Sequence, residues 1–575
     1  MDESVAAEAI NHTVAADFLT ALWDHGIEYV FANPGTDFAP IIEALVAFSQ
    51  QGRPTPKFVT VPHENVAIAM AQGYYQIARK PAAVMVHVTV GTANTICGLM
   101  NANRDYTPVL MMAGRTPLTE TGSTGARNNQ IHWGQENFDQ GGMVREQVKW
   151  DYELRSGQPV RTIIGRALDI AMTEPMGPVY LTLPREVLAE TVSADQTAPR
   201  ERAVGTPPPV ANADAIEQAA ELFANAEKPL IVAGRVGFRP AAFDVLGGLA
   251  ADFGLPIVQV NGPALSSDHP ANFGFVVNRF LPDADLVMVV ECPVPWVPRV
   301  INPQDKAKLI HLSPDPHFSG FPFRGFEMDV ALAGEPVETL RQLHGALAVK
   351  TFGRESAIME RKNKIKETHL TLVAEKEEIL AKATTSNPIL PPWVAACIND
   401  AKSDDAISIN ELGINIDHIH HTGPGNYVGG GAAGGLGFGL GSALGAKLAA
   451  PDREVILTVG NGSYIFGNPT PAHFVGVAEN LPTLTIIMNN EQWFAVHRAT
   501  KSMYPDGVAA KANEMPLVDL KPSPQFHAIM EACGGYGECV ENPDDLPGAM
   551  KRALDKVRNG TPALLNVMTA PGGRD

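Results

Sequence analysis

One stretch, residues 454–493, constrains the fold of this chain more than any other. An apolar run from Val455 to Val459 predicts a buried strand, and a second run from Leu484 to Met488 predicts another. Between them lie a tight turn, Gly460-Asn461-Gly462-Ser463, and a segment that should contain a helix. The pattern predicts a strand, a crossover and a parallel strand. Ligands bind at the carboxyl ends of such strands, where this stretch places polar residues.

The polar residues at these two strand ends suit a metal-bridged diphosphate. A glycine turn lets backbone N–H groups approach phosphate oxygens closely. Mg²⁺ prefers hard oxygen ligands and often shares them with phosphate groups. The predicted metal ligands are the side-chain oxygens of Asn461 and Asn490 and a main-chain oxygen at Gln492.

This spacing resembles the signature of thiamine diphosphate (ThDP) enzymes, Gly-Asp-Gly followed further along the chain by Asn-Asn. The family's first metal ligand is usually Asp, and here Asn461 stands in its place. Because a neutral amide binds Mg²⁺ less strongly than a carboxylate, the diphosphate must supply more of the compensating charge. The resemblance implies that one group of residues binds the cofactor at this edge: Gly413, Gly460, Asn461, Gly462, Ser463, Asn490 and Gln492.

The composition predicts a globular enzyme and excludes several classes of partner. At 575 residues the chain is long enough for about three to four domains. Its net charge of −19 argues against nucleic acid or an anionic membrane surface as a partner. The five cysteines are scattered without metal-type or redox spacing, which fits a reducing compartment. The acidic N-terminus lacks a signal pattern, and no run approaches about 18 apolar residues, so we expect a cytoplasmic protein.

Residues 10–187 alternate helical and strand patterns, as α/β domains do. Short apolar strands are predicted at 29–31, 58–61 and 82–88, and polar residues follow each of them. These landmarks resemble the pyrimidine-binding domain in the acetolactate synthase and benzoylformate decarboxylase branch of ThDP enzymes. The resemblance continues over most of the chain.

Two residues of this domain carry the chemistry that the resemblance implies. Glu64, after the second strand, matches the residue that bonds a pyrimidine ring nitrogen and so activates the cofactor. This role needs a carboxyl group that shares a proton; the alternative is an acidic residue that favours a helix N-terminus, worth about 0.3–1 kcal/mol. His87 matches a histidine of benzoylformate decarboxylase-like enzymes that positions the substrate carboxylate and passes protons. Its alternative is a buried, structural histidine.

Other residues of this domain are expected near the cofactor or the substrate. Pro34 and Gly35 match cofactor-binding positions, and Thr36 matches a small hydroxyl residue that holds the substrate carboxylate. The alternative for Thr36 is an ordinary turn. Asn94 and Asn101 line the substrate pocket or belong to the scaffold.

Residues 205–346 resemble the family's central Rossmann-like domain, and residues 352–386 read as a charged connecting helix. The loop at 233–237 is a weak nucleotide signal. FAD, which acetolactate synthases hold in this domain, therefore has no supporting motif, and a scaffold without a ligand is the alternative. Benzoylformate decarboxylase-like enzymes send a second histidine from a loop that corresponds to 291–298. Here that loop contains no His and carries Trp296.

Residues 388–571 are the predicted diphosphate-binding domain. Within them, Gly434-Gly435-Leu436-Gly437 resembles the bend in which one apolar residue wedges under the cofactor. Leu436 is that residue, the Gly434 carbonyl would receive the cofactor's amino group, and a core role is the alternative. In Asp417-His418-Ile419-His420-His421, we favour a loop at the mouth of the site, with His418 facing substrate, over a metal site. Trp493, Phe494 and His497 add bulk near the cofactor and reshape the substrate pocket.

The sequence thus predicts an α/β protein of three doubly wound parallel-sheet domains. The predicted activity is ThDP- and Mg²⁺-dependent cleavage and formation of carbon–carbon bonds in 2-oxo acids, aldehydes or ketones. A benzoylformate decarboxylase-like decarboxylase or carboligase is the first choice. The alternatives are an acetolactate synthase-like carboligase with FAD and a non-catalytic or regulatory paralogue. By resemblance, we expect a dimer or tetramer with active sites between subunits.

Overall fold

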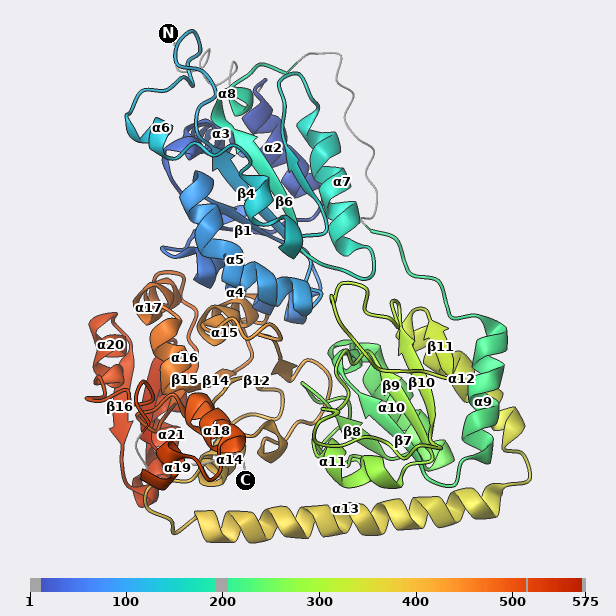
Figure 1. Cartoon of the computed structure of the whole chain (residues 1–575). Helices are drawn as coiled ribbons and strands as arrows, with labels where there is room; N and C mark the ends of the chain where they lie inside the picture. Colours follow the sequence, from blue (N-terminus) through green and yellow to red (C-terminus); the bar gives the residue numbers. More distant parts are fainter. Residues whose placement is uncertain (1–11, 193–204, 513–514, 571–575) are drawn as a thin grey trace.

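Each of three long segments of the chain folds around a parallel sheet in this computed structural model, which describes residues 12–192, 205–512 and 515–570 (Figure 1). All the strand pairs within these sheets are parallel, and helices flank them, as the predicted fold class requires. The predicted domain limits at residues 10 and 571, and the N-terminal segment without a signal pattern, lie outside the described residues. In the described part of the chain, no helix is long and apolar enough to cross a membrane.

The N-terminal sheet has the strand order β2-β1-β3-β4-β6-β5. Its strands are β1 (Tyr29–Asn33), β2 (Lys57–Thr60), β3 (Ala82–Val86), β4 (Val109–Arg115), β5 (Asp151–Glu153) and β6 (Val179–Pro184). The helices around it are α2 (Val14–Asp24), α3 (Ala39–Gln51), α4 (Glu64–Ala78), α5 (Val88–Arg104), α6 (Ile131–Gly134), α7 (Val160–Met172) and α8 (Arg185–Leu188), with the 3₁₀ turn η1 (Thr36–Phe38) after β1. The strand predicted at 82–88 ends at Val86, because His87 is already the cap of helix α5.

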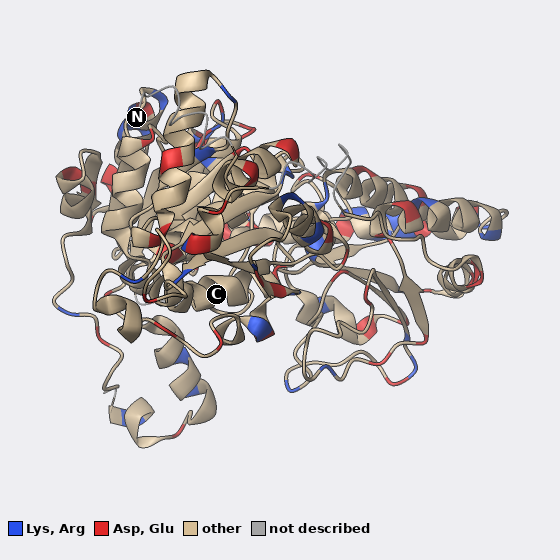
Figure 2. Cartoon of the chain, turned by 90° about the horizontal axis from the view of Figure 1, so that it is seen from above, with Lys and Arg blue, Asp and Glu red and all other residues tan. Residues whose placement is uncertain are grey.

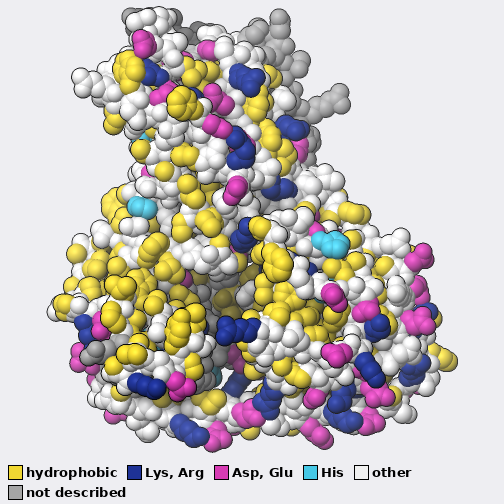
Figure 3. Space-filling view, viewed as in Figure 1, with side chains coloured by type: hydrophobic (Ala, Val, Ile, Leu, Met, Phe, Trp, Pro, Cys, Tyr) yellow, Lys and Arg dark blue, Asp and Glu magenta, His cyan; other side chains and the backbone are white. Residues whose placement is uncertain are grey.

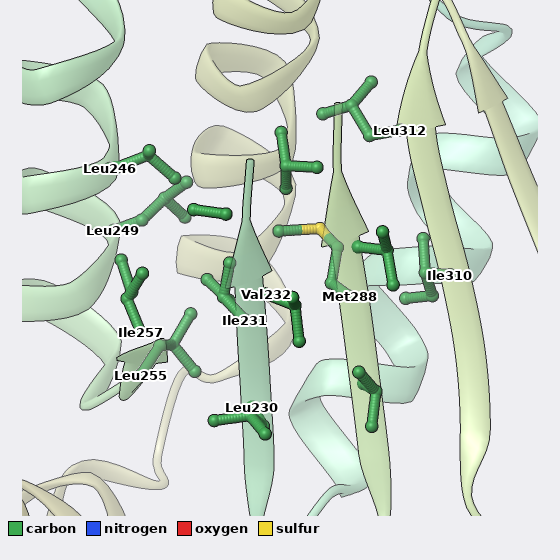
Figure 4. Packing of buried hydrophobic residues seen from close by; sticks show 14 of the residues in the cluster. Leu230, Ile231, Val232, Leu246, Leu249, Leu255, Ile257, Met288, Ile310 and Leu312 are labelled. Carbon is green, nitrogen blue, oxygen red and sulfur yellow. The ribbon is translucent and has the colours of Figure 1, made fainter. Parts of the chain in front are cut away.

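The central sheet has the order β11-β10-β9-β7-β8. Its strands are β7 (Pro229–Ala233), β8 (Ile257–Gln259), β9 (Leu286–Val290), β10 (Lys308–Ser313) and β11 (Val330–Ala333), and its helices are α9 (Ala213–Asn225), α10 (Pro240–Phe253), α11 (Val277–Phe280) and α12 (Pro336–Lys350). Ile231 of β7 and Ile257 of β8 face Leu246 and Leu249 of α10 (Figure 4). Full burial of one such side chain contributes about 1.5–3 kcal/mol.

Helix α13 (Glu355–Ala383) connects the central and C-terminal domains. Its 29 residues extend about 44 Å at 1.5 Å per residue. Of these residues only Ile365, Leu372 and Ala383 are buried, as expected for a solvated connector. In the view of Figure 2, the Lys and Arg residues of the described chain are interspersed with Asp and Glu.

The C-terminal sheet has the order β13-β12-β14-β15-β17-β16. Its strands are β12 (Ile407–Glu411), β13 (Tyr427–Val428), β14 (Val455–Gly460), β15 (Leu484–Asn489), β16 (Tyr536–Val540) and β17 (Ala563–Met568). Its helices are α14 (Pro391–Ala401), α15 (Phe438–Ala449), α16 (Asn461–Phe466), α17 (Pro469–Ala478), α18 (Phe494–Met503), α19 (Val508–Ala512), α20 (Phe526–Ala532) and α21 (Leu546–Arg558). The predicted turn at 460–463 is instead the start of α16, because Gly460 is extended and Asn461 is already helical.

Helices α4 and α15 join the N-terminal domain to the C-terminal domain through glycines. A Cβ on Gly445 would lie 2.0 Å from the Met70 carbonyl oxygen, and a Cβ on Gly73 would lie 2.1 Å from that of Ser442. Only glycine permits so close a contact between the two backbones. This contact brings Glu64, at the start of α4, toward the segment that precedes α15.

Candidate functional site

The predicted site residues follow strands at the switch points of two sheets. In the N-terminal sheet the chain leaves β1 for β2 on one side and then β3 on the other, so the loop after β1 faces His87 after β3. In the C-terminal sheet the same reversal occurs at β12, which lies between β13 and β14, and Gly413 packs against the backbone of Thr458 and Val459 near the end of β14. Crevices at such switch points are where open parallel sheets bind ligands.

Glu64 is the first residue of α4 and is buried, with 6% of its surface exposed. Its Oε2 accepts a hydrogen bond from Asn94 Nδ2 at 3.1 Å. A Cβ on Gly91 of α5 would come within 3.3 Å of Glu64 Oε1, so this glycine leaves room for the carboxylate. The structure thus brings Asn94 of α5 to Glu64 and places the Glu64 carboxylate against the first turns of α5.

His87 is paired with Asp37, a residue that the sequence argument did not single out. The imidazole Nδ1 lies 2.5 Å from Asp37 Oδ1, and Asp37 is only 2% exposed. On the other side of the ring, Gln135 Nε2 lies 3.3 Å from His87 Nε2. A carboxylate at Nδ1 keeps the proton on that nitrogen and fixes the ring orientation, which leaves Nε2 for proton transfer.

Glycines allow the backbone to pack closely around this pair. A Cβ on Gly35 would lie 2.1 Å from His87 Nδ1, and a Cβ on Gly114 would lie 1.8 Å from Asp37 Oδ2. Val88 has a φ of +30°, an unfavourable value for a β-branched residue. Strain of this kind clusters at functional sites. Thr36 is exposed at the same turn, beside the pair.

Side chains from two domains hold the segment that contains Leu436. Asn101 of α5 bonds both the N–H and the carbonyl oxygen of Gly435, at 3.1 and 2.7 Å, so it is a scaffold residue. Asn65 Nδ2 donates to the Leu436 carbonyl oxygen at 3.4 Å. Leu436 itself is only partly buried, and Gly434 is exposed with a φ of +73°. Leu436, the predicted wedge, therefore lies outside the hydrophobic core and next to Asn65, the residue that follows Glu64.

Glu411, at the end of β12, fixes the same segment from the other side. Its two carboxylate oxygens accept hydrogen bonds from the N–H groups of Gly437 and Gly439, at 2.7 and 2.6 Å. Desolvation by the surrounding protein raises the pKa of Glu411 to about 7. The ionised carboxylate, which can accept both bonds, therefore predominates above about pH 7.

The three predicted metal ligands lie at the ends of β14 and β15. Asn490 Oδ1 accepts the N–H of Gln492 at 3.0 Å, whereas the neighbouring Asn489 uses its side chain to bind Ser523 and Asn566. Asn461 is 2% exposed and its Nδ2 is buried without a hydrogen-bond partner; Gln492 Oε1 is likewise buried and unpaired.

These residues fit a metal-bound diphosphate. The unpaired amide nitrogen suits a phosphate oxygen, and the unpaired amide oxygen suits a cation. The remaining oxygens of the set, from Asn461 and Asn490, are hard ligands of the kind that Mg²⁺ takes.

Bulky side chains cover this edge of the sheet, as the sequence predicts. The indole of Trp493 lies against Gly462, where a Cβ would be 2.4 Å from Trp493 Cζ3. Phe494 and His497 stack on each other on α18, with ring centroids 5.7 Å apart. Ser463 is buried in α16. Glu491, between Asn490 and Gln492, has a φ of +57°, a second strained position at a predicted site.

His418 lies in a different place from the other candidates. It lines a cavity of about 430 Å³ between the central domain, α13 and the C-terminal domain, and none of the predicted cofactor residues lines that cavity. The surface is hollowed between these two domains (Figure 3). Among the described residues no group of three or more His, Cys, Asp or Glu side chains is arranged to hold a metal ion.

The switch point of the central sheet holds an ion pair. Glu291, after β9, binds Arg239 Nε and Nη2 at 2.8 and 2.7 Å. Arg235 donates to the Asp105 carbonyl oxygen at 2.6 Å. The crevice in which such a sheet would hold FAD therefore contains charged side chains that already have partners. Trp296 is buried in the core against Phe326 and has a packing role.

Within one chain, the start of α4 contacts the residues that follow α16, and the segment around Leu436 contacts the same residues. His63 Nε2 lies 3.2 Å from Asn468 Nδ2, and a Cβ on Gly437 would lie 2.7 Å from Gly467 Cα. Helix α16 then spans about 9 Å from this contact to Asn461. The geometry pairs these two domains without a second chain, and the predicted placement of the site between subunits stays a prediction.

Comparison with known proteins identifies the family. Three models of thiamine pyrophosphate enzymes match in order: the N-terminal TPP-binding domain at residues 12–143, the central domain at 216–343 and the C-terminal TPP-binding domain at 414–567. The chain belongs to the thiamine pyrophosphate enzyme family. The suspected resemblance is thereby confirmed.

The relatives span both branches of this family. A benzoylformate decarboxylase of Pseudomonas aeruginosa is 26% identical over 569 residues, covering 95% of this chain and 96% of the relative. A probable acetolactate synthase large subunit of Methanocaldococcus jannaschii is 23% identical, covering 97% and 94%. Among solved structures, a thiamine diphosphate-dependent 4-hydroxybenzoylformate decarboxylase of Rhodococcus jostii has a TM-score of 0.76 at 23% identity, covering 98% of this chain and all of that chain. This structural similarity supports the three-domain fold.

Proposed function

We propose that this chain is a ThDP- and Mg²⁺-dependent 2-oxo acid decarboxylase or carboligase. The observation that carries the proposal is the pairing of His87, at the start of α5, with the buried Asp37, together with the bond from Asn94 of the same helix to the buried Glu64. When bound, ThDP supplies the nucleophilic carbon that attacks the substrate carbonyl. One curated relative and two similar solved structures are benzoylformate or 4-hydroxybenzoylformate decarboxylases by name, and together with His87 they are our reason for placing the decarboxylase first.

Each residue of the proposed site has a defined task. Glu64 shares a proton with the cofactor's pyrimidine ring, in a slot where Asn94 orients the carboxylate. His87 holds the substrate carboxylate and moves a proton at Nε2, while Asp37 holds Nδ1. Thr36, exposed at the same turn, offers a hydroxyl to the substrate. Leu436 supports the cofactor from below.

We assign binding of the cofactor's diphosphate to the C-terminal domain. Asn461, Asn490 and a Gln492 oxygen hold Mg²⁺, and the backbone at Gly460–Ser463 approaches the phosphates. Trp493 and Phe494 exclude water from this edge and limit the size of the substrate. Because the loop at 291–298 brings no second histidine, His87 is the one imidazole that we assign to proton transfer.

The test is CO₂ release by cofactor-stripped protein from pyruvate, benzoylformate, phenylpyruvate and branched 2-oxo acids. We expect release from at least one of them that requires both ThDP and Mg²⁺. An acetolactate synthase-like carboligase is the second candidate, favoured by the acetolactate synthase relatives; it would form acetolactate from pyruvate. Intact protein that binds ThDP yet releases no CO₂ and forms no acetolactate would favour the non-catalytic paralogue.

Exposed apolar side chains support a homo-oligomer. Hydrophobic side chains gather over the C-terminal domain in the space-filling view (Figure 3). Among the exposed apolar side chains of this domain are, each about 40–50% exposed, Ile465, Phe466, Phe474 and Val496. Patches of this kind mark interfaces. Light scattering coupled to size-exclusion chromatography should give the mass of a dimer or a tetramer; a monomer at micromolar concentration would contradict this proposal.

A further inference from the structure

The predicted metal position is built from uncharged groups. Asn461 and Asn490 offer amide oxygens and Gln492 offers carbonyl oxygens, so the ligand set itself carries no negative charge. The nearby carboxylates are already engaged: Asp519 accepts from Gln492 Nε2 at 3.4 Å, and Glu491 pairs with Lys521 at 3.4 Å. A divalent cation alone therefore meets no free carboxylate among these residues.

Asn461 differs from a carboxylate in a second respect. A carboxamide has an acceptor oxygen and a donor nitrogen, whereas an ionised Asp can only accept. In this structure the donor end of Asn461 is buried and unpaired. A buried donor without a partner is destabilising, so an incoming acceptor gains more there than at an already bonded group. A phosphate oxygen is such an acceptor.

We infer that Asn461 donates Nδ2–H to a diphosphate oxygen of ThDP, so that ThDP binding does not require metal, and Mg²⁺, which turnover still requires, is taken up only together with the diphosphate. This inference rests on the proposed function, because it assumes that ThDP occupies this edge. An Asp at 461 would repel the diphosphate until a cation bridged the two, since like charges a few ångströms apart interact strongly at a partly buried site. The amide removes that repulsion and adds a hydrogen bond.

The experiment measures binding by calorimetry on cofactor-stripped, full-length protein. The titrants are Mg²⁺ alone, ThDP in EDTA, and ThDP with saturating Mg²⁺. For the wild type we expect no heat from millimolar Mg²⁺ alone, and a ThDP Kd that Mg²⁺ improves by less than about tenfold. For Asn461→Asp we expect Mg²⁺ to improve the Kd by more than about a hundredfold. Asn480→Asp, at an exposed turn residue, adds the same charge away from the site and should behave like the wild type.

A second variant separates the hydrogen bond from the charge. Asn461→Ala removes the donor without adding a carboxylate, and we expect it to weaken metal-free ThDP binding at least about fivefold. The inference is overturned if wild-type ThDP binding depends on Mg²⁺ as strongly as that of Asn461→Asp, or if Asn461→Ala leaves metal-free binding unchanged. Folded protein that binds ThDP under none of these conditions would overturn the proposed function itself.

Discussion

Replacing Asp37 with Asn tests whether the buried pair with His87 is part of the catalytic machinery. The substitution keeps the size of the side chain but removes the carboxylate charge, and with it the charge-assisted bond to His87 Nδ1. The bond lost is short, at 2.5 Å, and Asp37 is almost fully buried. Hydrogen bonds to charged groups contribute about 1.5–3 kcal/mol. At 1.36 kcal/mol per tenfold, kcat/KM should fall by about 10- to 150-fold.

The assay is CO₂ release from the 2-oxo acid that the substrate panel identifies. His87→Ala sets the scale, because removing a general acid–base group costs about 10²–10⁴-fold. Asp24→Asn is the matched control: Asp24 is half exposed in the same domain and pairs with Arg161, so activity should not change. If Asp37→Asn stays within twofold of the wild type while His87→Ala loses more than a hundredfold, the positioning role of Asp37 is refuted.

Three further predictions concern the scaffold. Glu411→Gln places a side-chain N–H opposite a backbone N–H of the 437–439 segment, which should weaken ThDP binding by about 1–3 kcal/mol, measured from the Kd. An unchanged Kd would show that the two hydrogen bonds from Glu411 do not support cofactor binding. Gly445→Ala should destabilise by about 1–3 kcal/mol in denaturant unfolding, because its Cβ would lie 2.0 Å from a carbonyl oxygen, whereas Gly345→Ala, in open helix surface, should not. Burial lowers the pKa of His421 to about 3 and of His473 to about 4, from an ordinary 6.5. Below pH 6.5 the unfolded state then binds more protons than the folded state. The free energy of unfolding of the C-terminal domain should therefore fall by up to about 3 kcal/mol per pH unit between pH 6 and 4. Equal unfolding midpoints at pH 7 and 5 would contradict this.

Local patterns in the sequence predict many of the individual strands and helices, whereas the arrangement into three domains was implied by the resemblance to the ThDP family. Apolar runs such as 455–459 and 484–488 are strands of the C-terminal sheet, and the residues after them lie at its carboxyl edge. The charged segment at 355–382 is a helix. These features depend on periodicity and burial within a few residues, which sequence reasoning captures well.

Pairings between distant residues were beyond that reasoning. Asp37 and His87 meet because β1 and β3 are neighbours in the sheet. The residues around Asp37 and His87 do not determine the strand order. Glu411 acquires its role because residues 437–439 return over the end of β12. At Asn461 the sequence predicts a turn where the structure has the start of α16, since Gly-Asn-Gly-Ser favours both. A signal was present in each case: Asp37 and Glu411 stand in the same strand-end loops as Thr36 and Gly413.

Turnover by Glu64→Gln is the measurement that tests the account most directly. The variant keeps the shape of the side chain but cannot share a proton with the cofactor's pyrimidine ring. With ThDP and Mg²⁺ restored, we predict that CO₂ release is abolished, while the ThDP Kd stays within about tenfold and thermal unfolding matches the wild type. Near wild-type turnover in the folded variant would contradict the assignment of Glu64 and with it the proposed ThDP site.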